Sequence, residues 1–182
     1  MPDVNSNEDI MDSRDVIEAV EELEDDIKFN ESELEDAVNE LDRLEEELEE
    51  INVQIDDDDG SDKDVLLEIE TARDEHETAI THQVNTVDEL RSDISDIEDE
   101  LKPIKNFAED GEGYGDWENG ETLIRESYFV DYAKELVQDI GDLPQELPAY
   151  IENNIDWDGV ANDLLIDYTS LDFEGETYYM RA

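Results

Sequence analysis

The sequence predicts a mainly α-helical protein: a long antiparallel coiled-coil hairpin followed by a small α+β domain at the C-terminus. Over most of the first hundred residues, apolar side chains recur at alternating steps of four and three, which is the 3.5-residue repeat of a coiled-coil seam. A glycine-containing acidic segment interrupts this repeat near its middle and indicates a turn. Beyond the repeat the composition changes, because only Phe29 among the 13 aromatic residues precedes Phe107.

The first arm of the predicted hairpin follows an acidic segment, 1–11, that we expect to be flexible. The hairpin as a whole is expected over 12–105, and the seam of its first arm lasts for more than five heptads. Such a sustained repeat is the strongest structural signal in the chain. The seam consists of Val16, Val20, Leu23, Ile27, Asn30, Leu34, Ala37, Leu41, Leu44, Leu48, Ile51 and Ile55.

The turn is expected at 56–64, where the sequence DDDDGSDKD combines glycine and serine with a cluster of like charges. A second seam with the same spacing follows, although its first half contains polar residues. Two arms of matching length around one short turn are expected to fold back as an antiparallel pair. The second seam consists of Leu66, Ile69, Arg73, His76, Ile80, Gln83, Val87, Leu90, Ile94, Ile97, Leu101 and Ile104.

Two registers fit this pairing equally well. One sets Ile51 opposite Leu66, and the other, shifted by a heptad, sets Ile55 opposite Ile69. Four seam positions are polar, and a buried polar residue in a coiled coil lowers stability while penalising wrong registers. These residues either specify the register or mark a loosely packed, hydrated seam, and the sequence favours neither explanation. They are Asn30, Arg73, His76 and Gln83.

The composition of the sequence changes after the hairpin. We expect a glycine-rich linker over 106–121 and a small α+β domain over 122–182. Within the domain, apolar residues fall on one face of a predicted helix over 129–140, which Gly141 would end.

The rest of the domain carries turn and cap signals. Pro144 and Pro148 indicate a turn or short helix, and Asp156 is placed to cap a further helix. The chain then alternates as expected for a β-hairpin over 170–180. The residues of its turn are Glu174 and Gly175.

Charge dominates the composition, with 60 Asp and Glu against 11 Lys and Arg and a formal net charge of −49. Such a chain repels nucleic acid and anionic membranes at long range, so neither is expected as a partner. The expected partner is a basic protein surface, such as the groove of a DNA-binding enzyme. Because 37% of the residues are hydrophobic and recur periodically, we expect a folded protein rather than a disordered acidic chain.

The predicted hairpin has a charge density close to that of DNA. Residues 12–105 contain 37 acidic and 8 basic residues, a net charge of −29. At 1.5 Å per residue its arms form a rod of roughly 60 Å, over which B-DNA carries roughly 35 charges. An acidic surface is equally typical of proteins adapted to molar salt, where a Debye length of about 3 Å screens self-repulsion.

The sequence contains no sign of catalysis. The absence of cysteine excludes disulfides, thiolate metal sites and thiol nucleophiles, and no nucleotide-binding loop, nucleophile elbow or histidine-rich metal motif occurs. We therefore expect no enzymatic activity and no cofactor, with His76 as a polar seam residue and His82 as a solvated one. The polar, acidic start lacks the features of a signal peptide, so we expect the cytoplasm of a host cell or a virion.

One segment has the spacing of a calcium-binding loop. Acidic residues occupy positions where such a loop needs oxygen ligands, and Gly115 occupies the position of its sharp turn. Tyr114 breaks the pattern, and an acidic chain produces such matches by chance, so a glycine-rich linker is the simpler interpretation. The calcium candidates are Asp110, Glu112, Asp116, Glu118 and Glu121.

Three segments near the C-terminus resemble the antirestriction proteins of the ArdA type, which phages and mobile elements encode. They read SYFVDYAKEL from Ser127, DLPQELPAYI from Asp142 and IDWDGVANDLLIDY from Ile155. The resemblance extends from Ser127 to Arg181. It implies an acidic DNA mimic that occupies the DNA-binding groove of a type I restriction-modification enzyme, and a phage, an archaeal virus or a mobile element as the source.

Two hypotheses from different classes follow. The first is antirestriction-like inhibition of a DNA-binding host defence enzyme, in which exposed carboxylates take the place of phosphates in its basic groove. The second is a haloadapted coiled-coil structural or adaptor protein, for example of a virion, whose acidity is an adaptation to the solvent. Under either hypothesis two hairpins could pair as a homodimer. The residues expected to bind the partner are Glu45, Glu46, Glu49, Asp131, Glu135 and Asp163.

Overall fold

The computed structural model describes residues 4–57, 63–140 and 147–182. The chain forms two compact units, one made of Met1–Leu23 with Glu100–Ala182 and the other of Glu24–Asp99. We call the first the sheet unit and the second the hairpin unit. These boundaries differ from the predicted division after residue 105, because the sheet unit includes the ends of both long helices.

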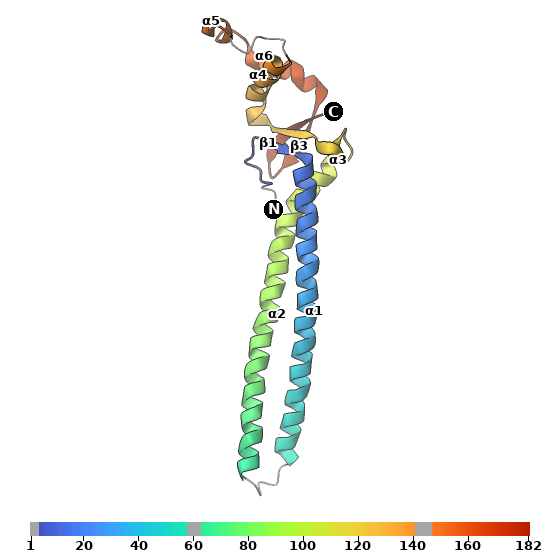
Figure 1. Ribbon diagram of the computed structural model, residues 1–182, viewed down its shortest axis with the longest axis vertical. Coiled ribbons are helices and arrows are strands. Elements are labelled where there is room, and N and C mark those ends of the chain that lie inside the picture. The colour runs from blue at the N-terminus through green and yellow to red at the C-terminus, as the bar shows by residue number, and fades with distance from the viewer. Residues whose placement is uncertain (1–3, 58–62, 141–146) are drawn as a thin grey trace. The chain divides into compact units, whose positions relative to one another are not determined.

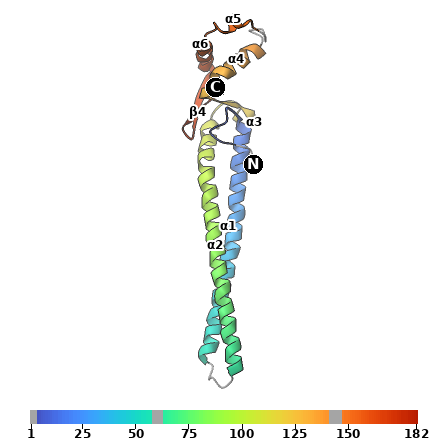
Figure 2. The ribbon, with the colours of Figure 1, turned by 90° about the vertical axis from the view of Figure 1, so that its left-hand side faces the viewer.

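Two long helices confirm the predicted fold class. They are α1, Ser13–Asp57, and α2, Lys63–Gly111, and they lie side by side in Figure 1 and again in Figure 2. Part of the predicted turn, 58–62, lies outside the described residues. No helix within the described ranges is long and apolar enough to cross a membrane.

The seam positions agree closely with the periodicity of the sequence. Every predicted seam residue is buried or half-buried, including the polar ones. Val16 and Leu23 are almost completely buried, at 0% and 2% exposure, whereas Phe29 is 65% exposed. The lone aromatic residue of the hairpin therefore lies on its outer surface, as its position between two seam residues requires.

The sheet unit contains a four-stranded antiparallel sheet in the order β1-β2-β4-β3. Only the β3–β4 hairpin is predicted by the sequence, and its turn residues Glu174 and Gly175 both have positive φ angles, 54° and 86°. β1 and β2 have three and four residues, too few for their alternation to be recognised. The strands are β1, Ile10–Asp12; β2, Thr122–Arg125; β3, Tyr168–Phe173; and β4, Glu176–Arg181.

Short helices lie between α2 and β2 and between β2 and β3. The helices predicted over 129–140 and after Asp156 are both present, and the Asp156 carboxylate accepts a hydrogen bond from the Gly159 backbone N–H at 3.0 Å. Gly141 and Pro144 lie outside the described residues. The helices are α3, Trp117–Gly120; α4, Phe129–Asp139; α5, Ala149–Glu152; and α6, Trp157–Leu164, with 3-10 turns η1, Glu126–Tyr128, and η2, Leu165–Asp167.

One face of the sheet packs against α4 and α6. Ile124 of β2 forms a buried cluster with Phe129 and Ala133 of α4 and Ala161 of α6. Tyr179 of β4 joins this cluster, with its ring centroid 5.2 Å from that of Phe129. Because successive residues of a strand point to opposite sides, the neighbours of Ile124 and Tyr179 along the chain face away from this layer.

The opposite face of the sheet packs against the end of α2. The ring of Phe107 stacks on Phe173 at 4.7 Å between centroids and meets Tyr178 edge-on at 5.8 Å. Trp117 of α3 completes this group, 6.1 Å from Phe107. The sheet is therefore sandwiched between α4 with α6 on one side and the last turns of α2 on the other.

The described residues 4–11 differ from the flexible tail predicted for 1–11. The backbone carbonyl of Glu8 accepts a hydrogen bond of 2.7 Å from the Tyr178 hydroxyl, and the Arg125 guanidinium lies 2.7 Å from the Asp9 carboxylate. Together with the pairing of β1, these contacts bind the segment to the sheet. Short-range patterns could not reveal them, because they join residues more than a hundred positions apart.

The predicted linker over 106–121 also differs from the structure. α2 continues to Gly111, and Trp117 is only 2% exposed. The buried Ser13 hydroxyl donates to the Trp117 carbonyl at 2.6 Å and accepts from the Glu121 N–H at 2.7 Å. These residues are therefore part of a core, although their glycine-rich composition is typical of a linker.

We predict that Gly111→Ala destabilises the sheet unit by about 1–3 kcal/mol, the usual result of overpacking a filled core. A Cβ atom at this position would overlap the six-membered ring of Trp117. Gly113→Ala is the matched control, because a Cβ atom there meets nothing within 4 Å. Thermal unfolding monitored by Trp fluorescence measures the difference, and equal unfolding temperatures for the two variants would contradict the packing described here.

Candidate partner-binding surface

The hairpin unit carries most of the chain's excess charge. Residues 24–99 contain 31 acidic and 5 basic residues, a net charge of −26. Each arm of the unit is about 50 Å long at 1.5 Å per residue, and B-DNA carries about 30 charges over that length. The unit alone therefore approaches the linear charge density of a DNA duplex.

Basic side chains of the hairpin unit offset charge mainly within their own helices. Their partners are three or four residues away or adjacent, the spacing at which side chains meet on a helix surface. Such pairs reduce the local charge but do not counter the repulsion between α1 and α2. Among the described residues they are Lys28 with Asp25, Arg43 with Glu40 and Glu47, Arg73 with Asp74 and Glu77, and Arg91 with Asp88.

Three of the predicted partner-binding residues belong to the hairpin unit. Glu45, Glu46 and Glu49 are all exposed on α1, and none forms a hydrogen bond or an ion pair with another described residue. Their charges are therefore not neutralised by neighbours within the part of the chain that the structure describes. This leaves them available to a basic partner.

The other three predicted residues belong to the sheet unit. Asp131 and Glu135 are exposed on α4, and Asp163 is exposed on α6. Lys134 lies 2.7 Å from the Asp131 carboxylate and partly neutralises it. The Tyr128 hydroxyl donates to Glu135 over a long 3.4 Å. Of these three, Asp131 is the least suited to an external cation.

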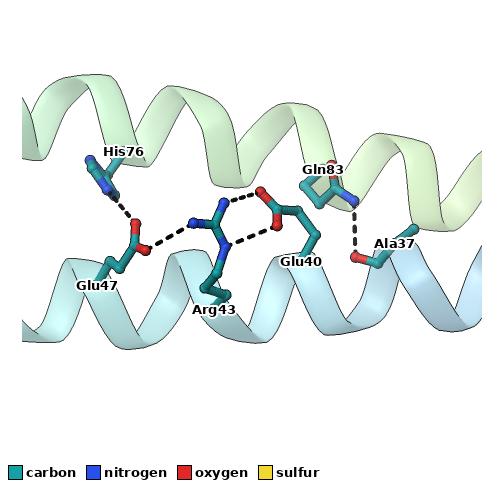
Figure 3. Close-up of polar contacts among 6 residues, drawn as sticks. All are labelled: Ala37, Glu40, Arg43, Glu47, His76 and Gln83. Atoms are coloured by element: carbon teal, nitrogen blue, oxygen red, sulfur yellow. Dashed lines mark hydrogen bonds and ion pairs between the residues drawn. The ribbon is translucent and has the colours of Figure 1, made fainter.

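Polar contacts across the seam of the hairpin unit include those of Gln83 and His76. Gln83 of α2 donates a hydrogen bond from its side-chain amide to the backbone carbonyl of Ala37 at 2.9 Å, and His76 Nε2 lies 3.0 Å from Glu47 Oε2. Figure 3 shows both contacts, with Arg43 holding Glu47 from its own helix. The sequence identifies His76 and Gln83 as seam residues but does not identify their partners.

The contact of His76 with Glu47 distinguishes between the two registers, whereas the contact of Gln83 with Ala37 is compatible with both. When Ile55 lies opposite Ile69, His76 lies opposite Leu48, beside Glu47, and Gln83 is one helical turn from Ala37. The same register sets Ala37 opposite Val87, and these two are buried at 7% and 3% exposure. The structure therefore has the register shifted by a heptad. The sequence signal for Glu47 is its position beside Leu48, the seam residue that lies opposite His76 in the shifted register.

The other two polar seam residues make contacts within their own helices. The Asn30 amide donates to the Asp26 carbonyl at 2.9 Å. Arg73 pairs with Asp74 and Glu77, and its buried Nε has no hydrogen-bond partner among the described residues. Thus His76 and Gln83 both make contacts across the seam, and that of His76 distinguishes the register, whereas Asn30 and Arg73 occupy half-buried seam positions and make contacts within their own helices.

The environment of His76 favours its charged form. Hydrogen bonding to the Glu47 carboxylate raises the pKa of His76, and the Ala72 carbonyl, 3.1 Å from Nδ1, raises this pKa further. The imidazole is 28% exposed, so water screens part of the interaction.

The proposed calcium ligands do not assemble into a metal site. Asp110 is still within α2, Glu118 lies in α3, and Glu121 follows that helix. Among the described residues, no three His, Cys, Asp or Glu side chains are grouped so that they could hold a metal ion. The calcium hypothesis therefore gains no support from the arrangement of these residues.

The C-terminal segments that carry the family resemblance meet in the core of the sheet unit. The hydroxyl groups of Tyr132 and Tyr168 are 3.2 Å apart, and the Phe129 ring meets Tyr168 edge-on at 5.1 Å. Burial raises the pKa of Tyr168. The two tyrosines line a cavity of about 340 Å³ between α4, α6 and the sheet. These residues therefore stabilise the unit, and its external acids come from other positions.

Comparison with known families extends this resemblance. The chain matches the family described as antirestriction protein (ArdA) over residues 5–178. The match is broader than the resemblance at 127–181, because it includes the whole hairpin and the strand that precedes it. Neither a curated protein nor a solved structure matches the chain.

We predict that salt stabilises the hairpin unit. Repulsion between the acidic helices is screened over about 8 Å at 0.15 M salt and about 3 Å at 1 M, so the midpoint of thermal unfolding should rise with KCl concentration. Circular dichroism at 222 nm measures this rise. The triple variant Glu45→Gln, Glu46→Gln, Glu49→Gln should unfold at a higher temperature at low salt and show a smaller rise. A midpoint independent of KCl would mean that self-repulsion does not limit stability.

Proposed function

Because this chain belongs to the ArdA family of antirestriction proteins, we propose that it inhibits a restriction enzyme by occupying the groove in which that enzyme binds DNA. The acidic surface of the inhibitor takes the place of the DNA substrate of the restriction enzyme. This inhibition requires neither catalysis nor a cofactor. The target class implied by the sequence resemblance is a type I restriction-modification enzyme.

The observation that supports DNA mimicry most directly is the charge of the hairpin unit. Its net charge of −26 is spread over two adjacent helices about 50 Å long, so a basic groove built for DNA meets a similar number of negative charges per unit length. A groove of this kind selects its ligand by charge and shape more than by any single contact. Exposed, unpaired acids such as Glu45, Glu46 and Glu49 meet that requirement.

Association should be driven largely by released counterions. The acidic helices and the basic groove each hold ions from the solution, and these ions return to bulk when the surfaces meet. The affinity should therefore fall steeply as salt increases, as it does for DNA itself. The same negative field prevents the protein from binding nucleic acid.

We predict that the protein inhibits DNA cleavage by a type I restriction-modification enzyme in competition with DNA. Raising the DNA concentration should restore cleavage, and the apparent inhibition constant should rise steeply between 0.05 and 0.2 M KCl. Cleavage assays at several DNA concentrations measure both effects. If cleavage is never inhibited at low salt, while the hairpin folds only in molar salt, acidity is an adaptation to the solvent and DNA mimicry is wrong.

We predict further that the hairpin contributes more to inhibition than the sheet unit does. The triple variant Glu45→Gln, Glu46→Gln, Glu49→Gln should weaken inhibition by roughly 3- to 150-fold, since each exposed ion pair contributes about 0.2–1 kcal/mol. Its matched control is Asp131→Asn, Glu135→Gln, Asp163→Asn, which removes the same number of charges from the sheet unit. Equal losses in the two variants would mean that net charge alone, rather than the hairpin surface, determines affinity.

A further inference from the structure

The hairpin unit has few fully buried side chains. Those among its described residues are Ala37 and Val87. Among the described residues of 38–57 and 63–86, which we call the distal segments, no side chain is buried. Burial of apolar area is the main favourable contribution to helix pairing in water, and in the distal segments this contribution comes from half-buried seam residues alone.

A polar contact crosses the seam within these distal segments. His76 of α2 lies between two acceptors, with Nδ1 3.1 Å from the Ala72 carbonyl of its own helix and Nε2 3.0 Å from the Glu47 carboxylate of α1. Arg43 holds the second oxygen of Glu47 at 3.1 Å, which fixes the carboxylate in place (Figure 3).

The geometry around His76 favours the charged form of the ring. A neutral imidazole has one N–H and one lone pair, whereas the imidazolium has two N–H groups. With an oxygen acceptor at each nitrogen, only the imidazolium can donate to both. Loss of the proton leaves a lone pair facing either the Glu47 carboxylate or the Ala72 carbonyl, and it removes the positive charge between two acidic helices.

We propose that the contact between His76 and Glu47 is a pH-operated clasp, which holds the distal segments of the hairpin together while His76 is protonated and lets them separate when it is neutral. The device regulates the same acidic surface as the proposed function. Closed, the distal segments present the acids of both helices side by side; open, each helix presents its own acids alone, at about half the linear charge density.

The surroundings of His76 determine the direction of the pH dependence. On α1 it faces Glu47, which Arg43 also holds, and on α2 the charged neighbours are Glu75 and Arg73. Because the pKa of His76 is raised in the folded hairpin, its contribution to stability is fully present below the ordinary histidine pKa of about 6.5. This contribution is lost as the pH rises through the folded-state value.

The pH range of the clasp contains few other titrating groups. Within residues 24–99 the only side chains with ordinary pKa values between about 6 and 9 are His76 and His82. His82 is exposed, and its side chain makes no hydrogen bond or ion pair with a described residue. It therefore serves as an internal control.

The clasp can be tested by measuring the distance between the arms. The natural chain has no cysteine, so Asn52→Cys and Thr71→Cys introduce the only two sites for spin labels, both exposed and both closer to the turn than the clasp. Double electron–electron resonance at pH 6.0 and pH 8.5, at constant ionic strength, should give a narrow, short distance distribution at the lower pH and a broader, longer one at the higher pH.

Three variants in the labelled background identify the responsible group. His76→Gln should give the broad distribution at both pH values, and His76→Lys, which keeps a cation beside Glu47, should give the narrow one at both. His82→Gln should respond to pH like the parent. A parent distribution that does not change with pH, or a pH response that survives in His76→Gln, would overturn the clasp.

The link to inhibition is tested separately at one fixed pH. At pH 8.5, His76→Lys should inhibit the restriction enzyme more strongly than His76→Gln by several-fold. Equal inhibition would show that clasp closure does not regulate the proposed function, while the distance measurements would still decide whether the clasp exists. Absence of inhibition by the parent protein would refute the proposed function. The distance measurements alone would then decide whether the clasp exists.

Discussion

The structure depends on an apolar seam that holds two strongly acidic helices together. Each arm of the hairpin repels the other, because the unit carries 31 acids against 5 basic residues and most of those bases pair within their own helix. The ion pairs of the described basic residues Lys28, Arg43, Arg73 and Arg91 lie within single helices and do not offset the repulsion between the arms. The free energy of pairing must come from burial along the seam, and the regular 3.5-residue repeat is the pattern that this demands.

Polar residues enter the seam at two levels of the hairpin unit. Ala37 and Val87 are both buried, and Gln83 donates to the Ala37 carbonyl. Farther toward the turn, His76 and Glu47 cross the seam where no described side chain is buried. A hydrogen-bonded or charged contact has strict geometric requirements, so it penalises a shifted register more strongly than an aliphatic layer does. The contact between His76 and Glu47 therefore favours one of the two registers that leucines alone would leave ambiguous.

The sequence predicted the features that local periodicity encodes. All seam positions, the α4 and α6 helices, the Asp156 cap and the β3–β4 turn follow from spacing and residue type within a short window. The four-stranded sheet did not follow, because β1 and β2 are short and pair across more than a hundred residues. The sequence places Trp117 in a linker, because the neighbouring glycines are typical of linkers and give no sign of its packing against Phe107. In each case the missing information was a contact between distant parts of the chain.

The residues that carry the family resemblance lie in the core, whereas those that would carry the function lie on the outer surface. Phe129, Ala133 and Ala161 are buried in the sheet unit, and a core residue is constrained by its packing neighbours. An acid on the outer surface of a helix has no such neighbours, and another acid one turn away can supply nearly the same field. A DNA mimic can therefore exchange individual carboxylates while keeping its charge density. Recognisable sequence should persist in the core of such a protein, even though its partner meets the exterior.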